Sequence, residues 1–210
     1  MHLSRLTLNP RSRAVRRDTS NPYHMHQTLA RILDGDGLTL WRLEDTILLV
    51  QSQERPDWGQ LEPGYLARPS ESKPMDVASI VALERPLRFR LRANPNKSES
   101  KPKAERGTRK ESGRPTSGKR TGLYELEDQV GWLNARASAN GFELLDFMVS
   151  HSDRWKFHKP DSSIPITLAV AEFDGHLRIT DPTRFRTTLE QGLGRGKALG
   201  LGLFSVGPSR

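Results

Sequence analysis

In the first half of the chain, apolar residues recur at every second position in some segments, as in a strand, and at every third or fourth position in others, as in a helix. In the segment 22–33, Met25, Leu29 and Ile32 fall on one stripe of a helix. The Asn-Pro pair that opens this segment is typical of a helix N-terminus. The predicted elements are a strand Leu3–Leu8, an Arg-rich loop Arg11–Asp18, a helix Pro22–Leu33, a hairpin of strands Leu38–Leu43 and Thr46–Gln51, a short helix near Gly59–Leu66 and a strand Leu87–Arg92.

The second half repeats this order, although its opening strand is weakly marked and is expected near Leu123. The predicted elements are a helix Glu125–Asn140 ended by Gly141, strands Phe142–Ser150 and Ile166–Ile179, the latter bent or broken at Asp174–Gly175, a helix Pro182–Gln191 and a strand Leu199–Val206. Strand, helix, two strands, helix, strand is the ferredoxin-like arrangement. We therefore expect an α+β fold of two tandem ferredoxin-like (RRM-like, βαββαβ) domains.

The segment 96–121 separates the two halves. It holds nine Lys or Arg and three Glu, which is six of the net charge of +8, and its largest apolar residue is Ala104. Because such a segment cannot bury a core, we expect a flexible basic linker. The expected organisation is a first domain at 1–95, the linker at 96–121 and a second domain with a glycine-rich loop at 122–210.

The composition narrows the classes of function. The absence of cysteine excludes disulfides and thiolate metal sites, and no metal or cofactor is expected. No apolar stretch approaches the ~20 residues of a membrane span or forms a signal-peptide core, so we expect a cytoplasmic protein without a membrane partner. The positive charge clusters at 1–31 and 184–210 as well as in the linker, which favours a polyanionic partner such as RNA.

Tyr23 and His26 are the candidate catalytic residues. They lie three positions apart, so they are neighbours on the helix and point away from its apolar stripe. An imidazole titrates near neutral pH and can transfer protons, although an ordinary surface histidine would show the same pattern. His24 lies on the opposite flank near Arg31, and we expect it to be a surface residue.

The strand 87–92 places apolar residues on one face and Arg88, Arg90 and Arg92 on the other. Three like charges on one strand face disfavour folding unless a polyanion binds there or acids lie opposite. We favour the polyanion.

Two further basic segments are candidates for contact with nucleic acid. Arg154–Lys159 is expected at an exposed hairpin tip that enters an RNA groove, with a solvated loop as the alternative. Gly192–Gly202 holds five glycines and two cations, but Gln191 and Ala198 stand where a Walker A loop needs Gly and Ser or Thr. Its backbone could approach phosphates closely, or it could be a tight packing turn. The residues expected to bind RNA are Arg13, Arg16, Arg17, Arg31, Arg88, Arg90, Arg92, Lys119, Arg154, Lys156, Arg195 and Lys197.

Six motifs follow one another along nearly the whole chain. They are Leu6–Pro10, Asn21–His26, Leu87–Pro95, Gly118–Arg120, Gly175–Pro182 and Gly192–Gly202. With these motifs the chain resembles the CRISPR-associated repeat endoribonuclease CasE of the type I-E Cascade complex. Arg-Leu-Arg-Ala-Asn-Pro and the terminal glycine loop are its most specific parts. The resemblance implies tandem ferredoxin-like domains and places the family's catalytic tyrosine and histidine at Tyr23 and His26.

The resemblance also implies an activity and partners. The protein is expected to cut CRISPR precursor RNA at the base of each repeat hairpin and to keep the mature RNA together with other Cascade subunits. RNA supplies its own nucleophile, the ribose 2′-hydroxyl, so the products should be a 2′,3′-cyclic phosphate and a 5′-hydroxyl. His26 would act as acid or base, and Tyr23 would orient the nucleophile or phosphate.

Two alternatives use a similar fold without catalysis. A non-catalytic RNA-binding subunit would bind the same RNA without cutting it. An RNA-recognition-motif protein would present aromatic residues on its central strands, where this sequence has arginines.

Overall fold

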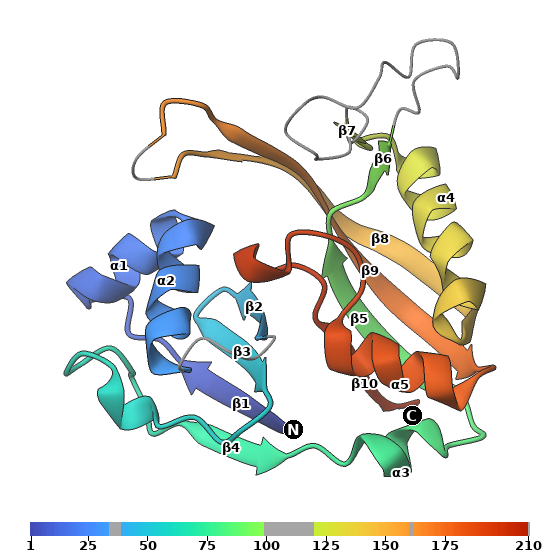
Figure 1. Cartoon of the computed structure of the whole chain (residues 1–210), viewed down its shortest axis with the longest axis horizontal. Coiled ribbons are helices and arrows are strands. Elements are labelled where there is room, and N and C mark those ends of the chain that lie inside the picture. Colours follow the sequence, from blue (N-terminus) through green and yellow to red (C-terminus); the bar gives the residue numbers. More distant parts are fainter. Residues whose placement is uncertain (34–38, 99–119, 160–161, 210) are drawn as a thin grey trace, which may run out of the picture.

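The computed structural model of the chain describes residues 1–33, 39–98, 120–159 and 162–209. Within these residues the chain forms two four-stranded antiparallel sheets and a two-stranded one. Figure 1 shows the first large sheet on the left and the second on the right, with a long hairpin extending from the second toward the helices of the first.

The first unit is a ferredoxin-like βαββαβ unit in which one short turn replaces the second helix. Its elements are β1 (His2–Thr7), α1 (Arg13–Ser20), α2 (Pro22–Ile32), β2 (Leu40–Glu44), β3 (Ile47–Ser52), the 3-10 turn η1 (Trp58–Gln60) and β4 (Glu71–Pro74). The strand order is β2-β3-β1-β4. Met25, Leu29 and Ile32 of α2 are buried in one core with Leu6 of β1, so the predicted helical stripe is confirmed.

The second unit has the corresponding strand order, β10-β5-β9-β8. Its elements are β5 (Leu87–Ala93), α4 (Leu126–Ala137), the 3-10 turn η3 (Ser138–Asn140), β8 (Phe142–Phe157), β9 (Ile166–Ile179), α5 (Pro182–Gln191), the 3-10 turn η4 (Lys197–Leu199) and β10 (Phe204–Pro208). Phe89, Phe173 and Phe185 are fully buried in its core, between the sheet and the helices. A short helix, α3 (Val77–Val81), packs against α5. The predicted fold of two tandem ferredoxin-like units is confirmed.

The predicted place of the strand at 87–92 in the first half is wrong. This strand, β5, pairs with β9 and β10 of the second sheet, and it is the opening strand that was expected near Leu123. The first sheet is completed instead by β4, which pairs with β1. The sequence of β4, Glu-Ser-Lys-Pro, is largely exposed and lacks alternation, so it carries no strand signal. The two sheets therefore divide between Pro74 and Leu87, ahead of the expected boundary at residue 95.

The segment 11–18 is not the predicted loop, because most of it belongs to α1. The Ser12 hydroxyl caps this helix by accepting a hydrogen bond from the Val15 N–H at 3.5 Å. Ala14 and Val15 are buried, which anchors α1 to the first core, while the arginines of the helix are exposed. Two small apolar residues among many charged ones are only a weak signal for a helix, so the sequence did not reveal α1.

The β8–β9 hairpin is longer than predicted, because β8 continues to Phe157. β9 has the predicted bounds, but it is continuous at Asp174–Gly175 instead of bent or broken there. A Cβ atom on Gly175 would lie 2.2 Å from the Asp146 carbonyl oxygen. The glycine therefore allows the two strands to approach closely without a break. The last strand, β10, begins at Phe204, later than predicted.

The described ends of the segment 96–121 are paired strands and not a flexible linker. β6 (Asn96–Ser98) and β7 (Arg120–Gly122) form an antiparallel pair, and the Leu123 N–H donates a hydrogen bond to the Pro95 carbonyl at 3.0 Å. The rest of the segment, with Lys119, lies outside the described residues.

Candidate active site and nucleic-acid interface

Tyr23 and His26 lie side by side at the start of α2. The Asn21 side chain caps this helix by accepting a hydrogen bond from the Tyr23 N–H at 2.9 Å, and Pro22 occupies the first turn. Met25 points into the core, and both candidate side chains remain partly exposed. Their ring centroids are 6.2 Å apart in an edge-to-face arrangement. The helix therefore presents a phenol and an imidazole together, the Tyr23–His26 pair, as predicted.

The far end of the β8–β9 hairpin reaches the same end of α2. The Asn21 side-chain amide donates a hydrogen bond to the His158 carbonyl at 3.0 Å. The Lys159 ammonium lies 5.6 Å from the centroid of the Tyr23 ring, within the range of a cation–π contact. Figure 1 shows the hairpin extending over α1 and α2. Residues from the second unit therefore complete the surroundings of the Tyr23–His26 pair.

The hairpin also carries Arg154 and Lys156, both of which were expected to bind RNA. Both side chains are exposed. The Arg154 guanidinium lies 4.1 Å from the centroid of the Tyr124 ring, and a bound phosphate could still contact the outer edge of such a stacked guanidinium. The strand pairing continues through both residues, so they belong to an ordered ribbon instead of a solvated loop.

The glycine-rich loop Gly192–Gly202 packs tightly against the first unit. The Trp41 indole N–H on β2 donates a hydrogen bond to the Ala198 carbonyl at 3.3 Å. A Cβ atom on Gly200 would lie 2.6 Å from the Trp41 ring. The turn η4 inside this loop contacts both α2 and β2. The loop is therefore packed tightly on the first unit, as one of the two interpretations expected, and it contacts the helix that carries the Tyr23–His26 pair.

The same loop brings cations to this side of the molecule. Burial lowers the pKa of Lys197, which is partly exposed.

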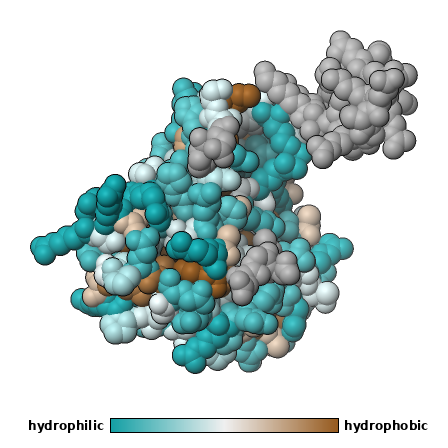
Figure 2. All heavy atoms as spheres, turned by 60° about the vertical axis from the view of Figure 1, so that its left-hand side comes forward, coloured by the Kyte–Doolittle hydropathy of each residue, from teal (hydrophilic) through white to brown (hydrophobic). Residues whose placement is uncertain are grey.

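Figure 2 views the molecule from the side of α1 and α2, and most of the surface seen there is hydrophilic. The exposed arginines that were expected to bind RNA, apart from Arg154, are Arg13, Arg16, Arg17, Arg31, Arg88 and Arg195.

A buried carboxylate that we did not predict joins α1 to α2. Asp18 accepts hydrogen bonds from the hydroxyls of Thr28 at 2.7 Å and Tyr65 at 2.8 Å, and from the Arg17 guanidinium at 2.8 Å. Burial and the bond to Asp18 raise the pKa of Tyr65. Because Thr28 belongs to α2, this network fixes the position of the candidate catalytic helix. The sequence shows only one acid in the basic segment 1–31, which does not reveal the role of Asp18.

Acids on neighbouring strands balance two of the three β5 arginines, contrary to the prediction of a balancing polyanion. Arg90 donates a hydrogen bond to Asp174 on β9 at 2.7 Å, and Arg92 forms an ion pair with Glu172 on the same strand. Arg90 also lies 3.5 Å from Glu44 of the first unit. The sequence could not show this compensation, because it does not reveal that β5 pairs with β9.

Arg42 on β2, which contacts the same Glu44, links the first unit to the second. Its buried guanidinium donates a hydrogen bond to Glu44 at 2.7 Å and another to the Leu203 carbonyl at 3.2 Å. Burial lowers the pKa of Arg42. Burial also disfavours the ionised form of Glu44, but the Arg42 and Arg90 guanidiniums outweigh it and lower the pKa of Glu44. The bond to Leu203, which directly follows the glycine-rich loop, ties the end of that loop to β2 of the first unit.

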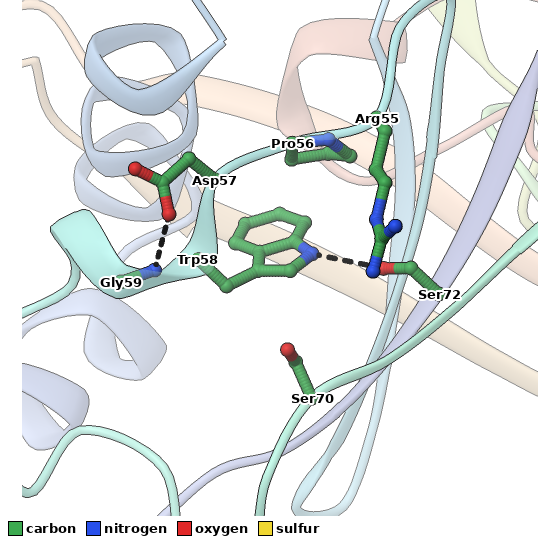
Figure 3. A pocket seen from close by; sticks show the side chains of 7 residues that line it. All are labelled: Arg55, Pro56, Asp57, Trp58, Gly59, Ser70 and Ser72. Atoms are coloured by element: carbon green, nitrogen blue, oxygen red, sulfur yellow. Dashed lines mark hydrogen bonds between the residues drawn. The ribbon is translucent and has the colours of Figure 1, made fainter.

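A separate pocket of about 440 Å³ lies at the other end of the first unit (Figure 3). The Trp58 indole N–H there donates to the hydroxyls of Ser4 at 3.1 Å and Ser72 at 3.3 Å. The residues that line this pocket do not include the Tyr23–His26 pair. In the described part of the chain, no cluster of three or more His, Asp or Glu could hold a metal ion. None of the described helices is long and apolar enough to cross a membrane.

Comparison with known proteins assigns the family. The sequence pattern of a family described as CRISPR associated protein matches residues 1–208. The CRISPR-associated endoribonuclease Cse3 of Thermus thermophilus is 37% identical over 229 residues, which cover 99% of this chain and 100% of the relative. The chain belongs to the CasE family of CRISPR-associated proteins.

Solved structures of similar chains share the fold. Thermus thermophilus Cse3 bound to an RNA representing a pre-cleavage complex is 35% identical, with a TM-score of 0.77 over 99% of this chain and 98% of that one. A chain of a CRISPR RNA-guided surveillance complex in a pre-nicking state is 26% identical, with a TM-score of 0.69 over 98% of this chain and 99% of that one. The motif-based resemblance is confirmed.

Proposed function

We propose that this chain is a metal-independent endoribonuclease that cleaves CRISPR precursor RNA at the base of each repeat hairpin. The observation that carries the proposal is the position of the Tyr23–His26 pair at the start of α2, a helix that the far end of the β8–β9 hairpin reaches and that the glycine-rich loop contacts. All three segments bring cations or proton-transferring groups to one side of the molecule. The endoribonuclease activity and the bound RNA of the Cse3 relatives support this proposal.

The chemistry requires an aligned nucleophile and proton transfer. The ribose 2′-hydroxyl attacks the adjacent phosphorus, and the 5′-oxygen of the next nucleotide leaves, so the products are a 2′,3′-cyclic phosphate and a 5′-hydroxyl. His26 either takes the proton of the 2′-hydroxyl or donates one to the leaving oxygen. The Tyr23 hydroxyl orients the nucleophile or the phosphate by hydrogen bonding. Lys159, which lies over the Tyr23 ring, adds positive charge beside the phosphorane as negative charge develops on it.

The distribution of cations favours a protein that keeps its product. Arg154 and Lys156 on the hairpin, the arginines of α1 and the cations of the glycine-rich loop lie outside the Tyr23–His26 pair. They would contact the stem of the hairpin, which remains attached after cleavage, so cutting should weaken binding little. A chain of a CRISPR RNA-guided surveillance complex has the same fold, and we therefore infer that the mature RNA and other Cascade subunits are the cytoplasmic partners of this protein.

Replacing a single 2′-hydroxyl tests the mechanism. A repeat hairpin with a 2′-deoxy nucleotide just before the scissile phosphate should bind with unchanged affinity and remain uncut, because it lacks the nucleophile. A hairpin with the 2′-deoxy substitution one nucleotide further upstream is the matched control and should be cut normally. Cutting of the first substrate would rule out the cyclic-phosphate route, whereas binding without cutting of the unmodified hairpin would identify a non-catalytic RNA-binding subunit.

A further inference from the structure

A groove separate from the Tyr23–His26 pair runs beneath the β8–β9 hairpin. Its volume is about 360 Å³, and it lies between the hairpin, the α1–α2 junction and β2. Pro22 and Met25 line it, so the groove adjoins the helical turn that carries the Tyr23–His26 pair. We propose that this groove binds one unpaired base of the RNA, next to the scissile phosphate. The inference rests on the proposed function and adds the part of the substrate that is recognised.

Aromatic and apolar side chains form much of the groove wall. Trp41 and Leu43 contribute from β2, and Trp155 and Phe157 contribute from β8. Alternate residues of a strand share a face, so Trp155 and Phe157 project together from the face of the hairpin that is turned toward α2. A nucleobase has two flat apolar faces, and stacking on an aromatic side chain contributes about 1–3 kcal/mol per base. The lining also includes the cations Arg92, Arg154 and Lys156, so the groove suits a nucleotide, with a flat base for the aromatic wall and a phosphate for the cations.

The Trp155 side chain, which helps to line this groove, has an unused hydrogen-bond donor. The side chain is partly exposed, and its indole N–H has no protein partner within the described ranges. By contrast, the indole N–H groups of Trp41 and Trp58 both donate to protein oxygens, at 3.3 Å and 3.1 Å. A partly exposed indole with a free N–H is suited to a ligand that combines a flat face with acceptor atoms at its edge, as every nucleobase does.

Cations beside the apolar wall favour a nucleotide over an apolar peptide segment. Lys156 is exposed and makes no ion pair among the residues that the structure describes. Together with Lys159 it can contact the phosphates on either side of a base that enters the groove. A peptide side chain in this groove would leave these cations without a partner.

The position of the groove gives the bound base a function. Where a stem ends, the next nucleotide is free to leave the stack, so it can enter the groove at little cost. Holding that base fixes the strand that leads to the Tyr23–His26 pair and aligns the 2′-hydroxyl with the phosphorus. Trp155 is therefore a specificity-determining residue that contacts the RNA and selects hairpins with an unpaired base at the cut.

Coupling between a protein variant and an RNA variant tests this proposal. Dissociation constants are measured with uncuttable 2′-deoxy repeat RNA, intact or with one abasic position at each nucleotide flanking the scissile phosphate. Trp155→Ala should weaken binding of the intact RNA roughly 5- to 150-fold, the equivalent of one stacked base. With one of the abasic RNAs this difference between wild type and variant should disappear. Trp155→Phe should keep most of the affinity because a ring remains.

Met148→Ala is the matched control, since Met148 lies on the same strand, is 63% exposed and does not line the groove. It should bind all the RNAs like wild type, and thermal unfolding should show that Trp155→Ala remains folded. An unchanged affinity for Trp155→Ala, or an equal loss with every abasic RNA, would overturn the proposal. Cutting of unmodified RNA by wild type is scored separately, so a failure of base binding is distinguishable from a failure of the nuclease assignment.

Discussion

Replacing Gly200 with alanine tests whether close packing holds the glycine-rich loop against the first unit. Gly200 has φ of +82°, a backbone conformation that costs a residue with a Cβ atom about 1–2 kcal/mol. The new Cβ atom would lie 2.6 Å from the ring of Trp41, which is 4% exposed and held by its bond to Ala198. Overpacking of a buried ring adds about 1–3 kcal/mol. The free energy of unfolding should therefore fall by about 2–5 kcal/mol.

Gly64→Ala is the matched control for the backbone contribution. Gly64 has φ of +76°, but its Cβ atom would meet nothing within 4 Å, so this variant should lose only about 1–2 kcal/mol. Equilibrium unfolding in urea measures both losses. RNA affinity should fall in Gly200→Ala alone, because only that change displaces the loop that carries Arg195 and Lys197. Equal losses of stability in the two variants, or unchanged RNA affinity in Gly200→Ala, would refute the packing argument.

Three further predictions concern cofactor, product and pH. Cleavage should continue in excess EDTA, and a loss restored by magnesium would contradict the proposed mechanism. With limiting enzyme the reaction should stop after about one turnover, since product and substrate should bind with similar, salt-sensitive affinities; many turnovers without slowing would contradict retention. Burial disfavours ionised Asp174, but bonds from Arg90 and Ser150 outweigh it and lower the pKa of Asp174 below its ordinary value. The bonds of ionised Asp174 therefore stabilise the fold above the ordinary range of carboxyl pKa values, and this stabilisation is lost as the pH falls through the lowered pKa. From about pH 5 to pH 3, the free energy of unfolding in urea should consequently fall more steeply in wild type than in Asp174→Asn.

Local signals in the sequence were sufficient where an element is specified by its own residues. α5 has its predicted bounds because Asp181 caps it and Pro182 begins it, and Gln191 is followed by a glycine. The Tyr23–His26 pair was also predictable, since residues three apart on a helix are neighbours whatever the rest of the chain does.

Contacts between distant segments were not predictable from one sequence. The transfer of β5 to the second sheet and the acids opposite Arg90 and Arg92 both depend on strand pairing, which alternation alone does not determine. The approach of the hairpin to α2, seen in the bond between Asn21 and His158, joins residues that are far apart in the chain. The buried role of Asp18 likewise depends on Tyr65, which packs against it only in the folded protein.

The central claim, that His26 transfers a proton during RNA cleavage, is tested most directly by comparing His26→Ala with His24→Ala. Both histidines lie on α2, but His24 is on the other flank, where its Nδ1 is 3.2 Å from the Arg17 carbonyl. Single-turnover cleavage of an end-labelled repeat hairpin and its dissociation constant are measured for both variants. His26→Ala should cut at least ~100-fold more slowly than wild type with nearly unchanged affinity, while His24→Ala should cut at the wild-type rate. Cleavage by His26→Ala within a few-fold of wild type would contradict the account.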